Sequence, residues 1–176
     1  MTSPLHSHEE IEELLARERA NLMALYASVP PARRAVAPAA GGWSAVQVAE
    51  HVARVETGVA KMIGKGASMP RTASAEELLA AQLTPRKIAI VRDRQTKVEA
   101  PERTWPTGSV APETAIAALL QSREMLEAAF FEATDHVLDE IIFAHPIIGP
   151  LTLRAWVELV AHHDARHAAQ IAETLL

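Results

Sequence analysis

LRAWVELVAHHDARHAAQIAETLL, residues 153–176, has apolar side chains at steps of three and four, the spacing of an amphipathic helix with one buried face. The stripe also contains two histidines one helical turn apart, His163 and His167. Imidazoles spaced in this way on a buried face can bind one metal ion together. The residues of the stripe are Trp156, Leu159, Val160, His163, His167, Gln170, Ile171 and Thr174.

Two polar neighbours of this pair have other predicted roles. His162 falls on the flanking face with Glu158 and Arg166, where we expect it to meet solvent or a partner. The segment 163–167 is also similar to the zinc-protease motif, with Asp164 in the place of the glutamate base. Aspartate is shorter by one methylene and no other protease feature is visible. We therefore interpret Asp164 as a neighbour that supports the metal site or pairs at the surface, and not as a catalytic base.

Composition favours one domain of packed helices. The chain has 176 residues, of which 49% are hydrophobic and only 4% aromatic. This mix, with abundant alanine, suits closely packed helices better than sheets of β-branched and aromatic residues. We predict a single all-α domain over residues 1–176, a length that can bury a core without disulfides.

Charge and residue content exclude several classes of protein. The formal net charge is -5 and there is no run of Lys or Arg, which argues against nucleic acid or an anionic membrane as partner. Cysteine is absent, so any metal must bind through nitrogen or oxygen. No segment has the character of a signal peptide or a membrane span, and we expect a cytoplasmic location.

The other long helices are predicted from their caps and apolar stripes. Ser7 caps a helix that ends at about residue 28, and Ser44 caps one that ends at about residue 63. Pro112 suits the first turn of a third helix, from about residue 111 to 133, and Thr152 caps the last one. Between these two, residues 136–150 fit a turn of helix or a short extended piece.

The second and third long helices are joined by a long connection, residues 64–110. Ser74 and Thr84 can begin short helices within it, the second with a charged, wet outer face. Four amphipathic helices with one connection of this length predict a four-helix bundle with a crossover between helices 2 and 3.

A third histidine is predicted to face the bundle interior. His51 lies on the apolar stripe of its helix with Val48 and Val52. With His163 and His167 it provides three neutral nitrogen ligands and leaves a cation at least one open position, the ligand count of catalytic zinc sites. The other interpretation is that each is an ordinary core histidine and that the three never meet.

Two further side chains are candidates for a role near this site. Gln170 lies one turn beyond His167 and can hydrogen-bond a ligand imidazole, a metal-bound water or the neighbouring helix. Arg123 is predicted on or near an inward stripe, where it receives an anionic substrate group or pairs at the bundle surface. We interpret the remaining histidines as bystanders: His6, His8, His136 and His145.

The motifs of two helices together resemble a known family. Trp43-Ser44 opens a helix that carries Glu50-His51, and the segment 149–152 precedes a helix with Trp156 and the pattern HxxxHxxQ. This combination is similar to the DinB-like (damage-inducible) superfamily of metal-binding four-helix bundles. The resemblance covers nearly the whole chain.

The resemblance implies a divalent metal ion, zinc or nickel, bound by His51, His163 and His167. Together with the alanine-rich helix faces, it also implies a homodimer. Characterised members of the family include metal-dependent thiol transferases and a mycothiol-dependent maleylpyruvate isomerase, whereas many members have no assigned reaction. Whether this chain is an enzyme is therefore open.

Two hypotheses on function follow from the resemblance. The first is a metal-dependent enzyme, a thiol-dependent transferase or a hydrolase, that acts on a small molecule such as a low-molecular-weight thiol. The alternative is a non-catalytic metal-binding or stress-associated bundle, in which the metal serves stability or dimerisation.

Overall fold

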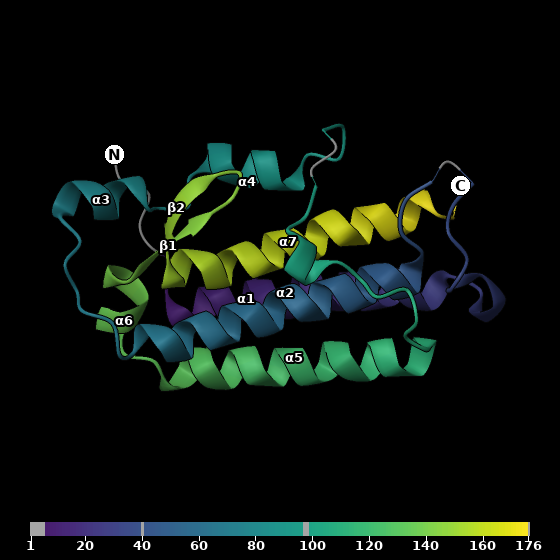
Figure 1. The fold of residues 1–176 in the computed structure, drawn as a ribbon, viewed down its shortest axis with the longest axis horizontal. Coiled ribbons are helices and arrows are strands. Elements are labelled where there is room, and N and C mark those ends of the chain that lie inside the picture. Colours follow the sequence, from purple (N-terminus) through teal and green to yellow (C-terminus); the bar gives the residue numbers. More distant parts are fainter. Residues whose placement is uncertain (1–5, 40, 97–98, 176) are drawn as a thin grey trace.

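Four long helices lie side by side in the computed structural model, which describes residues 6–39, 41–96 and 99–175 (Figure 1). Helix α7 packs against α1 and α2, and α2 also packs against α5. The predicted four-helix bundle is confirmed. The bounds of these helices are His8–Ser28 for α1, Ala45–Gly66 for α2, Pro112–Glu132 for α5 and Leu153–Glu173 for α7.

The predicted caps start three of these helices. Ser7 and Ser44 each form a reciprocal capping box, in which the serine oxygen accepts from a backbone N–H and the third helical residue accepts from the serine N–H. Thr152 caps α7 by accepting from the N–H of Ala155. Helix α2 continues to Gly66, a few residues beyond its predicted end.

The described residues of the crossover form two short helices and one 3-10 turn. Helix α4 lies along α7, and the chain then passes over α2 to reach the start of α5 (Figure 1). The bounds are Ala75–Ala80 for α3, Pro85–Arg92 for α4 and Glu102–Thr104 for η2; a further 3-10 turn, η1, spans Pro31–Arg33.

A small hairpin precedes α7. Strand β1 (Ile142–His145) pairs antiparallel with β2 (Gly149–Thr152), and the short helix α6 (Asp135–Glu140) comes just before β1. Both forms expected for residues 136–150 therefore occur in succession. The hairpin lies at the start of α7, where the indole N–H of Trp156 donates to the Phe143 carbonyl at 3.1 Å.

The first half of α7 is buried on all faces, which corrects the expectation for His162. Its side chain does not meet solvent: Nδ1 accepts from Arg92 Nε at 3.0 Å, and Arg92 also donates to Glu18. Helices α4 and α6 and the side chain of His6 cover the face of α7 that periodicity assigned to solvent. Arg92 on α4 reaches α7 with its guanidinium group, although its side chain is still 42% exposed and α4 has no buried residue.

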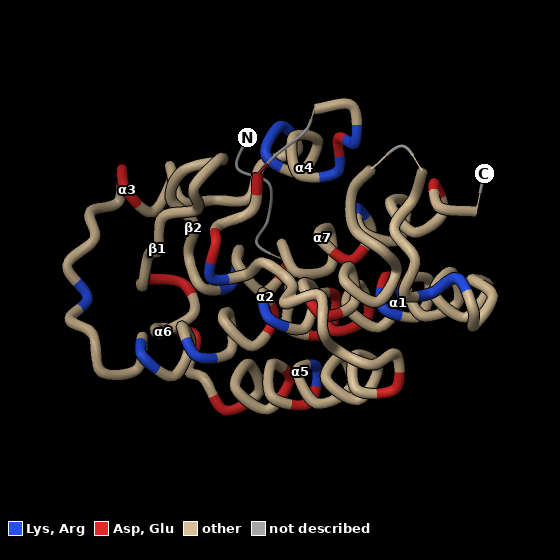
Figure 2. The backbone as a smooth tube through the Cα atoms, turned by 45° about the vertical axis from the view of Figure 1, so that its right-hand side comes forward, with Lys and Arg blue, Asp and Glu red and all other residues tan. Residues whose placement is uncertain are grey.

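Two apolar clusters fill the bundle, one toward each end. On α1, Leu15 belongs to one cluster and Leu22 to the other; on α5, Leu126 and Leu119 are divided in the same way. The turns between these pairs carry ionisable residues, coloured along the backbone in Figure 2.

Among the described residues, no helix combines the length and the apolar character needed to cross a bilayer.

A layer of four buried charges separates the two clusters. Arg19 of α1 donates to Asp164 of α7 and to Glu56 of α2, each at 2.9 Å. Arg123 of α5 donates to Glu56 at 2.7 Å and to Asp164 at 3.1 Å, and the Ser122 hydroxyl also donates to Glu56. Burial raises the pKa of the Asp164 carboxyl, while Arg19 and then Arg123 oppose this rise. Each long helix thus contributes one charge.

Breaking this layer is expected to destabilise the fold far more than breaking an exposed ion pair. Asp164→Asn removes one of the two carboxylates that neutralise Arg19 and Arg123. It should lower the free energy of unfolding by about 3 kcal/mol or more. The matched control is Glu173→Gln, whose carboxylate is half exposed and pairs with Arg94; its expected cost is about 1 kcal/mol or less. Urea unfolding measures both, and equal costs would contradict a structural role for the layer.

The end of α2 offers a second test of packing. A Cβ at Gly66 would lie 2.6 Å from Cδ1 of Leu153, which is fully buried, whereas a Cβ at Gly64 meets nothing within 4 Å. Gly64→Ala should therefore raise the free energy of unfolding by about 0.5–1 kcal/mol, the usual gain for removing a helical glycine. Gly66→Ala should lose that gain because Leu153 must shift. Equal stabilisation by the two substitutions in thermal melts would show that Leu153 can move away from a Cβ at position 66 at little cost.

Candidate metal centre

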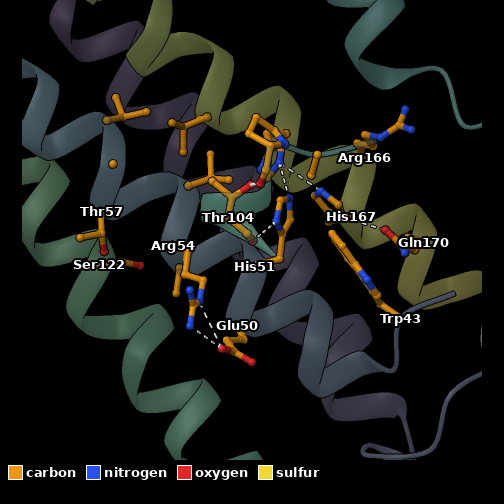
Figure 3. A pocket seen from close by; sticks show the side chains of 18 of the residues that line it. Trp43, Glu50, His51, Arg54, Thr57, Thr104, Ser122, Arg166, His167 and Gln170 are labelled. Atoms are coloured by element: carbon orange, nitrogen blue, oxygen red, sulfur yellow. Dashed lines mark hydrogen bonds and ion pairs between the residues drawn. The ribbon is translucent and has the colours of Figure 1, made fainter. Parts of the chain in front are cut away.

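The structure brings together the three histidines that the sequence placed on buried helix faces. Two of them, His51 and His167, are labelled in Figure 3. His51 comes from α2, and His163 and His167 come from successive turns of α7. The Nε2 atom of His163 lies 3.2 Å from that of His51 and 3.1 Å from that of His167. All three ligand atoms lie within 4.8 Å of one another.

The outer nitrogens of two rings have fixed partners. Nδ1 of His51 lies 2.8 Å from the Thr104 carbonyl, which can only accept, so this nitrogen carries the proton. Nδ1 of His167 donates in the same way to Oε1 of Gln170 at 2.8 Å. Because a neutral imidazole has one proton, both Nε2 atoms turn bare lone pairs toward His163.

His163 cannot satisfy both of these lone pairs. Its Nε2 can donate to one neighbour at most, and its Nδ1 is buried with no hydrogen-bond partner among the described residues. As a hydrogen-bond network of protein groups alone, the cluster leaves a buried acceptor unsatisfied, which is costly.

The donor set fits a divalent cation. Nitrogen ligands about 2.0–2.1 Å from a tetrahedral zinc ion lie roughly 3.3 Å apart, close to the two shorter spacings found here. Burial lowers the pKa of His51, and burial and the neighbouring imidazoles lower the pKa values of His163 and His167 well below the ordinary range. All three rings are therefore neutral at neutral pH, the form that binds metal. Binding of a metal ion by these three rings is a prediction.

A cleft of about 1480 Å³ opens beside the three rings. Trp43 lies on one side, with its ring 4.7 Å from that of His51. Apolar side chains of α2 and α7, including Val59, Trp156 and Val160, form part of the neighbouring wall. A small molecule in this cleft would thus contact the histidines directly and bury its apolar part against two helices.

The other predicted site residues divide into two groups. Gln170 makes one of its expected contacts, the hydrogen bond to His167. Asp164 and Arg123 do not lie at the metal site as expected. Both belong to the buried charge layer, do not line the cleft and make no hydrogen bond to the three histidines. Asp164 follows His163 in sequence, yet the helix turns the two side chains in different directions. Arg123 is paired in the interior, not at the bundle surface.

Residues of the crossover line the cleft, but sequence reasoning did not identify the group by which this segment contacts the histidines. The Thr104 carbonyl that orients His51 is a backbone group, for which the sequence carries no signal. Glu50 holds this segment in place, since its Oε1 accepts from the backbone N–H and the hydroxyl of Thr107, at 3.0 Å each, and pairs with Arg54 (Figure 3). The carboxylate directly before His51 was the one available hint.

His145 is a second residue that the sequence interpretation set aside. It was predicted to be a bystander in a loop, but it ends β1 and lines the same cleft as the three histidines. The hairpin that carries it was readable only as short apolar runs before Gly149-Pro150. Nothing in those runs indicated which way the ring would point.

Comparison with known proteins agrees with the fold. The chain is 25% identical over 137 residues to the uncharacterized protein YuaE of Bacillus subtilis (strain 168), a match that covers 77% of this chain and 79% of YuaE. It also superposes on the crystal structure of TT2238, a four-helix bundle protein, with a TM-score of 0.62 and 24% identity, covering 94% of this chain and 98% of TT2238.

A match to the sequence profile of a known family identifies the family of this chain. The profile of the DinB superfamily matches residues 14–171, which include α2 and α5 in full, most of α1 and α7, and all three clustered histidines. The resemblance inferred from the helix motifs is thereby confirmed, and this chain belongs to the DinB superfamily.

Proposed function

We propose that this protein binds a divalent cation, zinc or nickel, through His51, His163 and His167 and uses it in a reaction on a small molecule. The observation that carries the proposal is the convergence of three Nε2 atoms, at least one of them an unsatisfied acceptor, on the wall of a large cleft. Membership of the DinB superfamily supports it.

The chemistry follows from an incomplete ligand set. A cation held by three neutral nitrogens keeps an open position, where it lowers the pKa of a bound thiol or water and presents a nucleophile at neutral pH. The protein would contribute the orientation of the ligands: Thr104 fixes the ring of His51, and Gln170 fixes that of His167. A thiol-dependent transfer or a hydrolysis is the reaction class that this arrangement favours.

A non-catalytic role is the alternative, and one feature favours it. The three histidines join α2 to α7, and through Thr104 they also contact the crossover. A cation there would link segments far apart in the chain and stabilise the bundle.

We also propose that the protein is a homodimer. The exposed apolar side chains of Leu120 and Phe131 on α5 support an interface on that helix.

Metal binding is tested with chelator-treated protein. Titration with Zn²⁺ or Ni²⁺ in a calorimeter should show one ion per chain and a rise in the melting temperature. His163→Ala should abolish this binding, and Gln170→Leu should weaken it about 10–100-fold because His167 loses its orienting partner. His136→Ala, at an exposed histidine outside the cluster, is the matched control and should bind as the wild type does. The absence of both binding heat and a thermal shift in the wild type would overturn the metal centre.

A catalytic role of the metal is distinguished from a stabilising role by measuring turnover and melting temperature on the same variants. The metal-loaded protein should turn over at least one pair from a panel of thiols and electrophiles, or hydrolyse an ester or amide probe. Chelation and His163→Ala should each remove this turnover, while His136→Ala keeps it. A metal-dependent melting temperature without any metal-dependent turnover would instead support the stabilising role.

A further inference from the structure

His145 lines the cleft, and one of its two ring nitrogens is held within the hairpin. Its Nδ1 accepts the backbone N–H groups of Ile147 and Ile148, at 3.2 and 3.4 Å, within the turn of the hairpin. With Nδ1 occupied as an acceptor, the proton of the neutral ring is on Nε2. Burial lowers the pKa of His145 to about 4, so at neutral pH the ring stays in this neutral form.

Trp156 gives a rough separation between His145 and the three clustered histidines. The rings of His145 and Trp156 are 5.0 Å apart, and Trp156 precedes His163 by seven residues on α7. Seven helical residues correspond to roughly 10 Å along the axis. The His145 ring and the His163 ring line one cleft, and the helix surface between them is apolar, with Val160 on the same stripe.

The charges around the cleft favour an anion. Its two acidic lining residues, Glu50 and Glu173, are already paired with Arg54 and Arg94. Basic residues therefore remain in excess among the described residues of the lining, in a protein whose formal net charge is -5. A negatively charged ligand would be attracted to this cleft against the overall charge of the molecule. The basic residues of the lining are Arg54, Lys61, Arg94, Arg103 and Arg166.

From these observations we propose that His145 determines specificity for a small organic acid. Its Nε2–H binds the carboxylate of a molecule whose other end reaches the cation at His163 and whose apolar middle lies on Trp156 and Val160. The ligand is thus bifunctional, with a metal-binding group and a carboxylate on the order of 10 Å apart. This inference rests on the proposed metal centre and adds the class of molecule that the centre takes.

The test uses the protein loaded with Co²⁺, whose visible absorption reports a new ligand at the open position. The probes are monohydroxamates of dicarboxylic acids from succinate to suberate, in which the hydroxamate binds the metal and the carboxylate lies at increasing distance. Affinity should pass through a maximum at the chain length that reaches His145. At that length the free acid should bind about tenfold or more tightly than its methyl ester, because a charge-assisted hydrogen bond is lost in the ester. Acetohydroxamate, which has no carboxylate, measures the metal end alone.

Two substitutions at His145 isolate the donor from the hairpin. The side-chain oxygens of Asn and Asp can both accept the backbone N–H groups of the turn, so His145→Asn and His145→Asp should keep the hairpin. Both should bind acetohydroxamate as the wild type does. The advantage of the free acid over its ester should fall in His145→Asn and vanish in His145→Asp, where the carboxylates repel.

The possible results distinguish this inference from the proposed function. If Co²⁺ does not bind, the metal centre is overturned and the specificity proposal with it. If acetohydroxamate binds normally but the free acid keeps its full advantage in His145→Asp, or shows no preferred length in the wild type, only the role of His145 is overturned. Loss of the advantage with intact acetohydroxamate binding supports it.

Discussion

The mutual pairing of four buried charges is the constraint on which the rest of the structure depends. Arg19, Glu56, Arg123 and Asp164 come from four different helices, and each meets two partners of opposite sign. An apolar core tolerates small shifts of one helix along another, but a buried charge without its partner is far more costly. The layer therefore fixes the axial register of the bundle. Because Asp164 adjoins His163, the same register brings α2 and α7 together at the level where their histidines meet.

Local chemistry explains why most of the fold was predictable. Caps at Ser7, Ser44 and Thr152 and the periodicity of the apolar residues are properties of short segments, and they located the long helices. The same periodicity placed all three clustered histidines on inward faces. It failed for His162, because which face of α7 is covered depends on segments distant in sequence, namely the crossover and the neighbouring helices. Periodicity distinguishes faces of a helix, but it does not say what each face meets.

The candidate site shows the same division between local and tertiary information. Its three histidines lie on two helices and were predictable from their spacing, whereas several groups that orient or surround them lie on connections. The Thr104 carbonyl reaches His51 only because the chain returns over α2 after α4, and Glu50 holds it there. The His145 ring reaches the cleft only because two strands pair ahead of α7. Such contacts are made by backbone geometry over long sequence separations, so no short motif encodes them.

The hairpin and the crossover form walls of the cleft without taking part in the packing of the four long helices against one another. Connections of this kind accept changes in length and sequence more readily than helix cores do. One bundle with an unchanged set of histidines can therefore accommodate different molecules when these two segments change. Members of the superfamily with the same three histidines are then expected to differ in substrate, and a shared metal centre identifies a shared type of chemistry rather than a shared reaction.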